Sequence, residues 1–259
     1  MGEILRYDHV DVSYNGACMV HDISFAVQSG EILGIAGESG SGKSTLLRAA
    51  MGLLGQDGMV TRGDIWYGGK SLPDLSSEEM RRISGSEIGM VFQSAGSSFC
   101  AIRTVGAQLF EMMQAHGMND RKLFEEQARE LFARFGFQDP RRMLDSYPFQ
   151  LSGGMQQRVG VVAAMLLCPK ILLADEPTSA LDVTVQKQVI EEMLLVREMF
   201  GTAILLVTHN MGVLRAMADK LLVMRDGRMV EYGEAGEVLE HPKAPYTKQL
   251  LAAVPRIRR

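Results

Sequence analysis

Apolar and polar positions partly alternate at the beginning of the chain, a pattern typical of β-strands. Two segments show it, ILRYDHVDVSY and DISFAVQSGEILGIAGE, and both are rich in β-branched and aromatic residues. The second contains a short apolar run, GEILGIAG, that leads into glycines. The next segment, KSTLLRAAMGLL, has its leucines and alanines at helical spacing. The predicted local order is therefore strand, glycine-rich loop and helix.

The pattern changes to helical spacing in the middle of the chain. LFEMMQAHG and DRKLFEEQARELFARFG place Glu and Arg between helically spaced apolar residues, and strand signals are few from about residue 94 to 168. We expect an inserted helical subdomain there. Strands return in KILLADEP, TAILLVTH and KLLVMRDGRMVEYG, with helical patterns between them, which favours a parallel α/β sheet. Asp226-Gly227 predicts a hairpin turn in the last segment.

Composition and charge narrow the class of protein. The 259 residues are 46% hydrophobic and 22% charged, which allows a sizeable core in one large domain or two small ones. A net charge of -4 argues against a nucleic-acid partner held by bulk charge. Cys18, Cys100 and Cys168 are scattered and odd in number, so we expect structural thiols in a reducing compartment rather than a metal site.

No segment is typical of a secretory signal or a membrane span. The N-terminus, MGEILRYDHV, is charged from its third residue and contains no apolar core. The longest uncharged apolar run, 159–168, has about ten residues, whereas a spanning helix needs about twenty. If the protein works at a membrane, it therefore docks on something already there.

The glycine-rich loop carries the most informative local motif. Residues 37–44, GESGSGKS, match G-x-x-x-x-G-K-[ST] between a predicted strand and a predicted helix. Glycines let successive backbone N–H groups turn toward an anion, and the helix adds its N-terminal dipole. Lys43 is expected to contact the β- and γ-phosphates of a nucleotide, and Ser44 to offer its hydroxyl to Mg²⁺. The loop is therefore predicted to bind phosphates; an ordinary glycine-rich turn is the alternative.

Three polar residues follow apolar strands. Asp175 and Glu176 end the apolar run of KILLADEP, and His209 ends TAILLVTH. Ligands of such sheets bind at the carboxyl ends of the strands. We expect Asp175 to bind Mg²⁺, directly or through water, and Glu176 to face a water that attacks the γ-phosphate. His209 is expected to hydrogen-bond that water or the phosphate. A solvated acidic turn and a structural histidine are the alternatives.

A second candidate anion site begins a helix in the middle of the chain. In LSGGMQQR, Ser152, Gly153 and Gly154 precede the helical pattern MQQRVGVVAAMLL, so a hydroxyl and exposed backbone N–H groups stand at a helix N-terminus. Because one nucleotide already has its glycine-rich loop, this site predicts a second nucleotide or the nucleotide of a partner. A plain serine cap is the alternative.

These motifs, with Gln93 in GMVFQ and the segment ILLADEPTSALD, occur in the order found in ABC-type ATPases, which the whole chain resembles. The resemblance implies one ATP-binding domain over residues 1–259. Its fold would be α/β, a P-loop NTPase with a RecA-like parallel sheet core, an N-terminal antiparallel β subdomain, a helical subdomain inserted at about 94–168 and a tail over about 234–259. The family also implies a head-to-tail dimer with two ATP molecules between the subunits.

The resemblance gives a role to each matching residue. Tyr14 in VSYN would stack on adenine, with a core tyrosine as the alternative. Gln93 would bridge Mg²⁺ and a loop that senses a membrane subunit, and Asp182 would lie at the dimer contact. The implied catalytic residues are Lys43, Gln93, Glu176 and His209, and the implied Mg²⁺ ligands are Ser44, Gln93 and Asp175. The implied ATP-binding residues are Tyr14, Gly37, Glu38, Ser39, Gly40, Ser41, Gly42, Lys43, Ser44, Thr45, Ser152, Gly153, Gly154 and Asp182.

A narrower resemblance is to the ATPases of peptide and nickel importers, carried by YPFQLSGGMQQR, LLVTHNMGVL and HPKAPYTKQLL. It implies a peripheral protein at the cytoplasmic face of the cell membrane. Its partners would be permease subunits, a second ATPase subunit that is identical or not, and indirectly a solute-binding protein that helps select the cargo. Some relatives hold an iron–sulfur cluster in a longer, cysteine-bearing tail; we expect none here, because the chain stops soon after Leu251.

Other classes fit less well. A repair or chromosome ATPase would insert a long coiled coil between Lys43 and Asp175, where the sequence is too short to contain one. A GTPase would need an Asn-Lys-x-Asp motif, which the sequence lacks. A non-hydrolysing subunit would not be expected to keep Glu176 and His209. An exporter ATPase stays open as the rival to the importer.

One segment departs from the importer pattern. Such importers usually have an acidic residue and two prolines after the glutamine, whereas SAGSSFCA follows Gln93 here. The absence of proline and the presence of Gly96 give the backbone more freedom. We expect a softer loop that changes coupling to the membrane partner and leaves nucleotide chemistry intact; neutral drift is the alternative.

Overall fold

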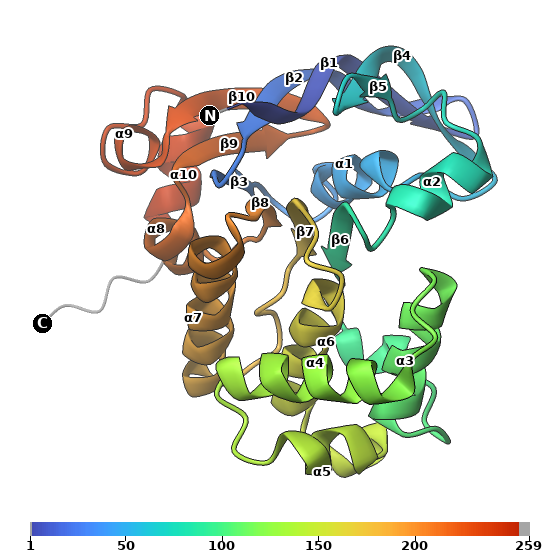
Figure 1. Ribbon diagram of the computed structural model, residues 1–259. Coiled ribbons are helices and arrows are strands. Elements are labelled where there is room, and N and C mark those ends of the chain that lie inside the picture. The colour runs from blue at the N-terminus through green and yellow to red at the C-terminus, as the bar shows by residue number, and fades with distance from the viewer. Residues whose placement is uncertain (1, 254–259) are drawn as a thin grey trace, which may run out of the picture.

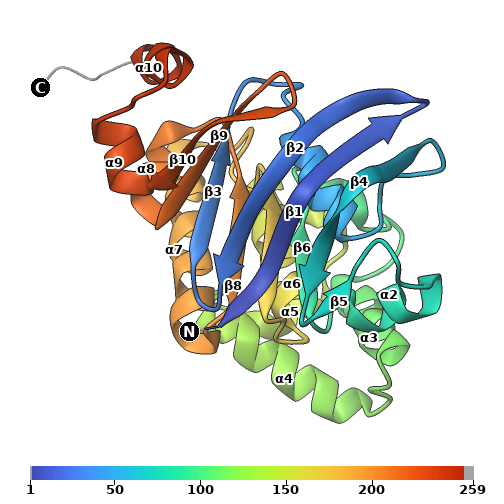
Figure 2. The ribbon, with the colours of Figure 1, turned by 90° about the horizontal axis from the view of Figure 1, so that it is seen from above.

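The computed structural model describes residues 2–253, which form two sheets and a set of helices. The smaller sheet is antiparallel, with the strand order β2-β1-β4-β5. It is built from β1 (Glu3–Tyr14), β2 (Ala17–Gln28), β4 (Gly58–Tyr67) and β5 (Lys70–Ser71). This sheet confirms the antiparallel β subdomain expected near the N-terminus, and Figure 2 shows it lying over the larger sheet.

The larger sheet has the order β10-β9-β3-β8-β7-β6. Its strands are β3 (Ile32–Ala36), β6 (Ile88–Val91), β7 (Ile171–Asp175), β8 (Ala203–Val207), β9 (Lys220–Arg225) and β10 (Arg228–Glu234). All neighbours are parallel except β10, which pairs antiparallel with β9. The predicted parallel sheet and hairpin are thus confirmed. Asp226 and Gly227 form the turn, both with positive φ, as a tight hairpin with right-handed strand twist requires.

The core lies on both faces of this larger sheet. In β3, Leu33 and Ile35 pack with α1 (Lys43–Ala50) and the antiparallel sheet, while Ile32 and Ala36 belong to the helical side. This alternation follows from the two-residue period of a strand. Because both faces are covered, β3, β7 and β8 are buried along their whole length.

Most helices lie on the face opposite the antiparallel sheet or at one end of the molecule (Figure 1). They are α3 (Val105–Ala115), α4 (Arg121–Arg134), α5 (Pro140–Asp145), α6 (Gly153–Met165), α7 (Val183–Phe200) and α8 (Met211–Met217). A short helix α2 (Ser77–Ile83) and two 3-10 turns, η1 (Ala95–Ser98) and η2 (Pro148–Gln150), complete the middle of the chain. None of the helices within residues 2–253 is long and apolar enough to cross a membrane.

The helices α3 to α6 are inserted between two neighbouring strands. β6 and β7 pair side by side in parallel, and the whole helical stretch connects them. The expected helical insertion is therefore confirmed, although the domain limits near 94, 168 and 234 stay predictions. The tail contains α9 (Ala235–Glu240) and α10 (Pro245–Ala252), while its residues 254–259 lie outside the described part of the chain.

Candidate active site

The glycine-rich loop joins β3 to α1 and needs glycine at two crowded or twisted positions. A Cβ atom on Gly37 would lie 2.3 Å from the carbonyl oxygen of Met224 in β9, so a side chain cannot fit there. Gly42 has a φ of 95° and caps α1, a left-handed conformation that favours glycine. Glu38, Ser39 and Gly40 form the exposed tip of the loop. Contacts with β9 hold the base of the loop, and its exposed tip leaves backbone N–H groups open to an anionic ligand.

Lys43 is the buried cation of this loop. Its side chain is folded back, and Nζ donates hydrogen bonds to the carbonyl oxygens of Gly37 at 2.9 Å and Glu38 at 2.7 Å. The residue is only 5% exposed, and this burial lowers the pKa of Lys43 below its usual value. The carboxylates of Glu176 and Asp175 oppose that shift, which places both acids within electrostatic reach of the ammonium group.

Ser44 and Asp175 are hydrogen-bonded at the carboxyl edge of the sheet. Asp175 is the last residue of β7 and is 6% exposed, while Ser44 lies in the first turn of α1. The Ser44 hydroxyl donates to Asp175 Oδ1 at 2.7 Å. A hydroxyl and a carboxylate are hard oxygen donors of the type that Mg²⁺ prefers, so the two side chains fit a magnesium ion beside a bound phosphate.

Glu176 and His209 form a second pair at the same edge. Because β7 and β8 are parallel neighbours, their carboxyl ends place Glu176 and His209 together, with His209 Nδ1 2.9 Å from Glu176 Oε1. Glu176 has a φ of 46°, a strained value for this residue type, and its N–H donates to the Val207 carbonyl at 2.8 Å. The strained turn holds a carboxylate and an imidazole side by side next to Lys43 and Asp175.

Ser152, Gly153, Gly154 and Asp182 lie at the starts of two adjacent helices. Ser152 caps α6 by accepting the Met155 N–H, and Asp182 caps α7 by accepting the Val185 N–H. The two helix starts approach closely, since a Cβ on Gly154 would lie 2.7 Å from Val185 Cγ1. Within residues 2–253, no hydrogen bond or ion pair joins these residues to the glycine-rich loop. Within the described residues, the two candidate anion sites are therefore not joined by any direct polar contact.

Gln93 follows β6 on an exposed loop, which is anchored by a residue that the sequence motifs do not single out. Gln157 on α6 binds the backbone on both sides of Gln93. Its Nε2 donates to the Phe92 carbonyl at 3.1 Å, and its Oε1 accepts the Ala95 N–H at 3.1 Å. Gln157 is 4% exposed, so the contact is shielded from water. The one sequence feature that could have indicated this anchor is Gln157 itself, the second glutamine of MQQR, a polar residue at the start of a helical pattern. That the loop is softer than in relatives stays a prediction, but it is tied to α6 at two backbone positions.

The remaining predicted residues lie in the smaller sheet and in the loop itself. Tyr14 ends β1, is half-buried, and packs on β4, because a Cβ on Gly58 would lie 2.6 Å from its Cε1 atom. Ser41 is buried, and its carbonyl accepts the Gly227 N–H at 3.3 Å. Thr45 is half-buried in the first turn of α1. Ser41 and Thr45 thus belong to the loop and the first turn of α1, while Tyr14 contacts β4, and its contact with adenine stays a prediction.

The glycine-rich loop, with its buried lysine, lies beside the acidic end of β7 and the Glu–His pair, which is the arrangement of a P-loop ATPase. A family model described as ABC transporter matches residues 20–179. The chain belongs to this ABC transporter family, as an ATP-binding member that hydrolyses ATP.

Curated relatives agree with this assignment, and solved structures share its fold. The chain is 41% identical over 236 residues to the dipeptide transport ATP-binding protein DppD of Escherichia coli (strain K12), covering 91% of this chain and 72% of the relative. It is 43% identical over 239 residues to the oligopeptide transport ATP-binding protein OppD of Salmonella typhimurium, covering 92% and 71%. The ATP-binding cassette MJ0796, a dimer bound to ADP and Pi, matches with a TM-score of 0.77 and 26% identity over 90% of this chain and 99% of that one. The fold also matches cbiO1 from Clostridium perfringens, with a TM-score of 0.81 at 24% identity over 99% and 98% of the two chains.

Proposed function

We propose that this chain energises a peptide importer by hydrolysing ATP at the carboxyl edge of its parallel sheet. The observation that carries the proposal is the convergence of Lys43, the Ser44–Asp175 pair and the Glu176–His209 pair at that edge. The names of the relatives, dipeptide and oligopeptide transport ATP-binding proteins, support peptide as the cargo class. Nickel stays the alternative cargo, and export the alternative direction.

Each residue has a distinct proposed role. Lys43 leaves its two carbonyl partners and contacts the β- and γ-phosphates, while the loop N–H groups surround them. Glu176 accepts a proton from the attacking water, and His209 holds that carboxylate in place and hydrogen-bonds the reacting group. Ser44, Asp175 and Gln93 would hold Mg²⁺, which neutralises phosphate charge when bound.

The second half of each site is proposed to come from another ATPase subunit. Ser152, Gly153 and Gly154 would face the γ-phosphate of the partner's ATP, Asp182 would lie at the contact, and Tyr14 would stack on adenine. Exposure of Ser152 and Gly153 supports this arrangement, as does the lack of any hydrogen bond between them and the loop within residues 2–253. The dimer of the similar cassette bound to ADP and Pi is a further support.

Mixing two inactive variants tests action between subunits. Lys43→Ala removes the phosphate cation, and Ser152→Arg blocks the partner-facing helix start. A mixed dimer then contains one site with both lesions and one with neither, so the mixture is expected to regain part of the ATPase rate. The measurement is ATP turnover against mixing ratio, with each variant alone as control. If no ratio restores activity, either the sites are not shared or a different chain is the natural partner.

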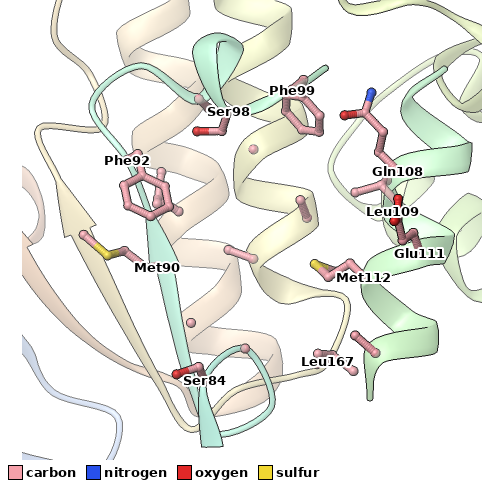
Figure 3. A pocket seen from close by; sticks show the side chains of 18 of the residues that line it. Ser84, Met90, Phe92, Ser98, Phe99, Gln108, Leu109, Glu111, Met112 and Leu167 are labelled. Atoms are coloured by element: carbon pink, nitrogen blue, oxygen red, sulfur yellow. The ribbon is translucent and has the colours of Figure 1, made fainter. Parts of the chain in front are cut away.

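A long apolar groove beside the Gln93 loop is the proposed contact with a permease. Its cavity of about 600 Å³ runs along β6, one of the two edge strands of the larger sheet, toward α3 and α6. Figure 3 shows Met90 and Phe92 on one side and Met112 on the other. The rim carries the Arg103–Glu111 ion pair. A cytoplasmic segment of a membrane subunit seated here would contact the Gln93 loop directly, and would place the chain at the cytoplasmic face of the membrane.

A charge placed in the groove is expected to uncouple the chain from that partner. Met112→Glu puts a carboxylate on an apolar wall, where burial without a partner is costly. Basal ATPase of the isolated subunit should stay within about twofold, while the stimulated ATPase of the assembled transporter falls about tenfold or more. Gln114→Glu, an exposed position on the same helix, is the matched control. Equal stimulation in the two variants would place the permease contact elsewhere.

Purification of the chain with its membrane complex tests the cargo. The bound subunits and solute would be identified, and transport direction measured in vesicles. Co-purified permease subunits with peptide uptake are expected. Outward transport would support the exporter, and uptake of a nickel chelate would support the other branch of the family.

A further inference from the structure

The C-terminal tail helix reaches the glycine-rich loop through one tyrosine. Tyr246 lies in the first turn of α10, in the segment HPKAPYTKQLL, and is 7% exposed. Its hydroxyl oxygen accepts the backbone N–H of Glu38 at 3.2 Å, although the two residues are 208 positions apart. The Arg225 guanidinium lies 4.9 Å from the centre of the same ring, which holds the ring from the β9 side.

The hydrogen bond acts on the peptide unit that also binds the phosphate lysine. The Gly37–Glu38 peptide donates its N–H to Tyr246, and its C=O accepts from Lys43 Nζ at 2.9 Å. In a trans peptide these two groups point in opposite directions, so Tyr246 and Lys43 hold the unit from its two sides. Bonds at both ends of one peptide polarise it and strengthen one another. The orientation of this peptide therefore depends on the tail.

The tail itself is fixed to the sheet. The Glu231 carboxylate on β10 accepts the backbone N–H groups of Lys243 at 2.7 Å and Ala244 at 3.1 Å, just before α10 begins. The adjoining hairpin also touches the loop, because the Gly227 N–H donates to the Ser41 carbonyl at 3.3 Å. Tyr246 thus projects from an anchored helix, and the loop is braced from outside at Glu38 and at Ser41.

We propose that Tyr246 is a positioning residue for nucleotide binding, which holds the glycine-rich loop in the conformation that receives phosphates. This inference rests on the proposed binding of a nucleotide at the glycine-rich loop. Without the hydroxyl, the Glu38 N–H loses its protein partner and the loop populates other conformations. Apparent affinity falls in proportion to the fraction of chains that remain competent to bind. The C-terminal helix would in this way set how tightly the site holds ATP.

Tyr246→Phe in the full-length chain tests this inference, since it removes one oxygen atom and keeps the ring and its contact with Arg225. The Kd values of MgATP and MgADP are expected to rise about two- to tenfold, the range of one lost hydrogen bond. Deuterium exchange of the peptide containing Glu38 should become faster in the nucleotide-free protein. Tyr232→Phe, on β10, removes a hydroxyl that makes no hydrogen bond to any other part of residues 2–253, and should change neither quantity.

The outcomes separate the two proposals. If the wild-type chain binds no MgATP, nucleotide binding itself fails. If the wild type binds and Tyr246→Phe matches it in both Kd and exchange, the positioning role of Tyr246 is wrong. A lower unfolding temperature with unchanged Kd and exchange would also overturn it, because it would show a purely structural role for the tail.

Discussion

Glu176→Gln is expected to lower ATP turnover by at least about a hundredfold while ATP binding is retained. Glutamine has the shape of glutamate but cannot accept a proton from water. The pair with His209 also changes, because only one oxygen of the replaced side chain can accept from Nδ1, whereas both carboxylate oxygens now lie within 2.9 Å of it. Bound ATP without hydrolysis should then accumulate in a dimer.

Turnover, ATP affinity and size-exclusion behaviour of the Glu176→Gln chain measure these three effects. Glu191→Gln, the same chemical change at an exposed position of α7, is the control and should behave as wild type. Near-normal turnover in Glu176→Gln would show that another group is the base. Loss of ATP affinity would show instead that Glu176 holds the nucleotide rather than the water.

Lys43→Ala is expected to abolish hydrolysis and to weaken ATP binding by about tenfold or more. Charge-assisted hydrogen bonds to phosphate are among the strongest that a side chain makes, and alanine supplies none. For the unfolding temperature of the nucleotide-free chain, the expectation is opposite: the substitution should not lower it. Burial lowers the pKa of Lys43, so the buried charge weakens the folded state, and the alanine chain should unfold at the same temperature or higher.

ATP titration and thermal unfolding, each with and without nucleotide, separate these effects. Lys187→Ala removes an exposed lysine and is the control for loss of one positive charge. Wild-type turnover in Lys43→Ala would refute the phosphate-binding loop. A marked drop in the unfolding temperature without nucleotide would show that the lysine stabilises the loop more than its burial costs. Together with Glu176→Gln, the pair distinguishes loss of binding from loss of chemistry.

The chemistry of the loop was readable from the sequence because it is encoded locally. The glycines that let the backbone turn, the lysine and the serine are contiguous, and the strand and helix on either side have clear periods. The acidic and histidine strand ends were found for the same reason, since a buried apolar run followed by a polar residue marks the edge of a sheet. The Asp226-Gly227 hairpin likewise depends on two adjacent residues.

The strand order, and the residues that hold the site in place, were decided by the tertiary structure alone. That β8 lies between β3 and β7, and that β6 is the edge strand beside the groove, follows from pairings between distant segments, which no local pattern contains. Gln157 binds the Gln93 loop from 62 and 65 positions away, and Tyr246 reaches Glu38 from 208 positions away. The amino-acid sequence by itself determined which residues are predicted to meet the phosphates, because backbone conformation and side-chain chemistry are local properties. The tertiary structure determined what holds those residues, because packing and hydrogen bonds join residues that only the completed fold brings together.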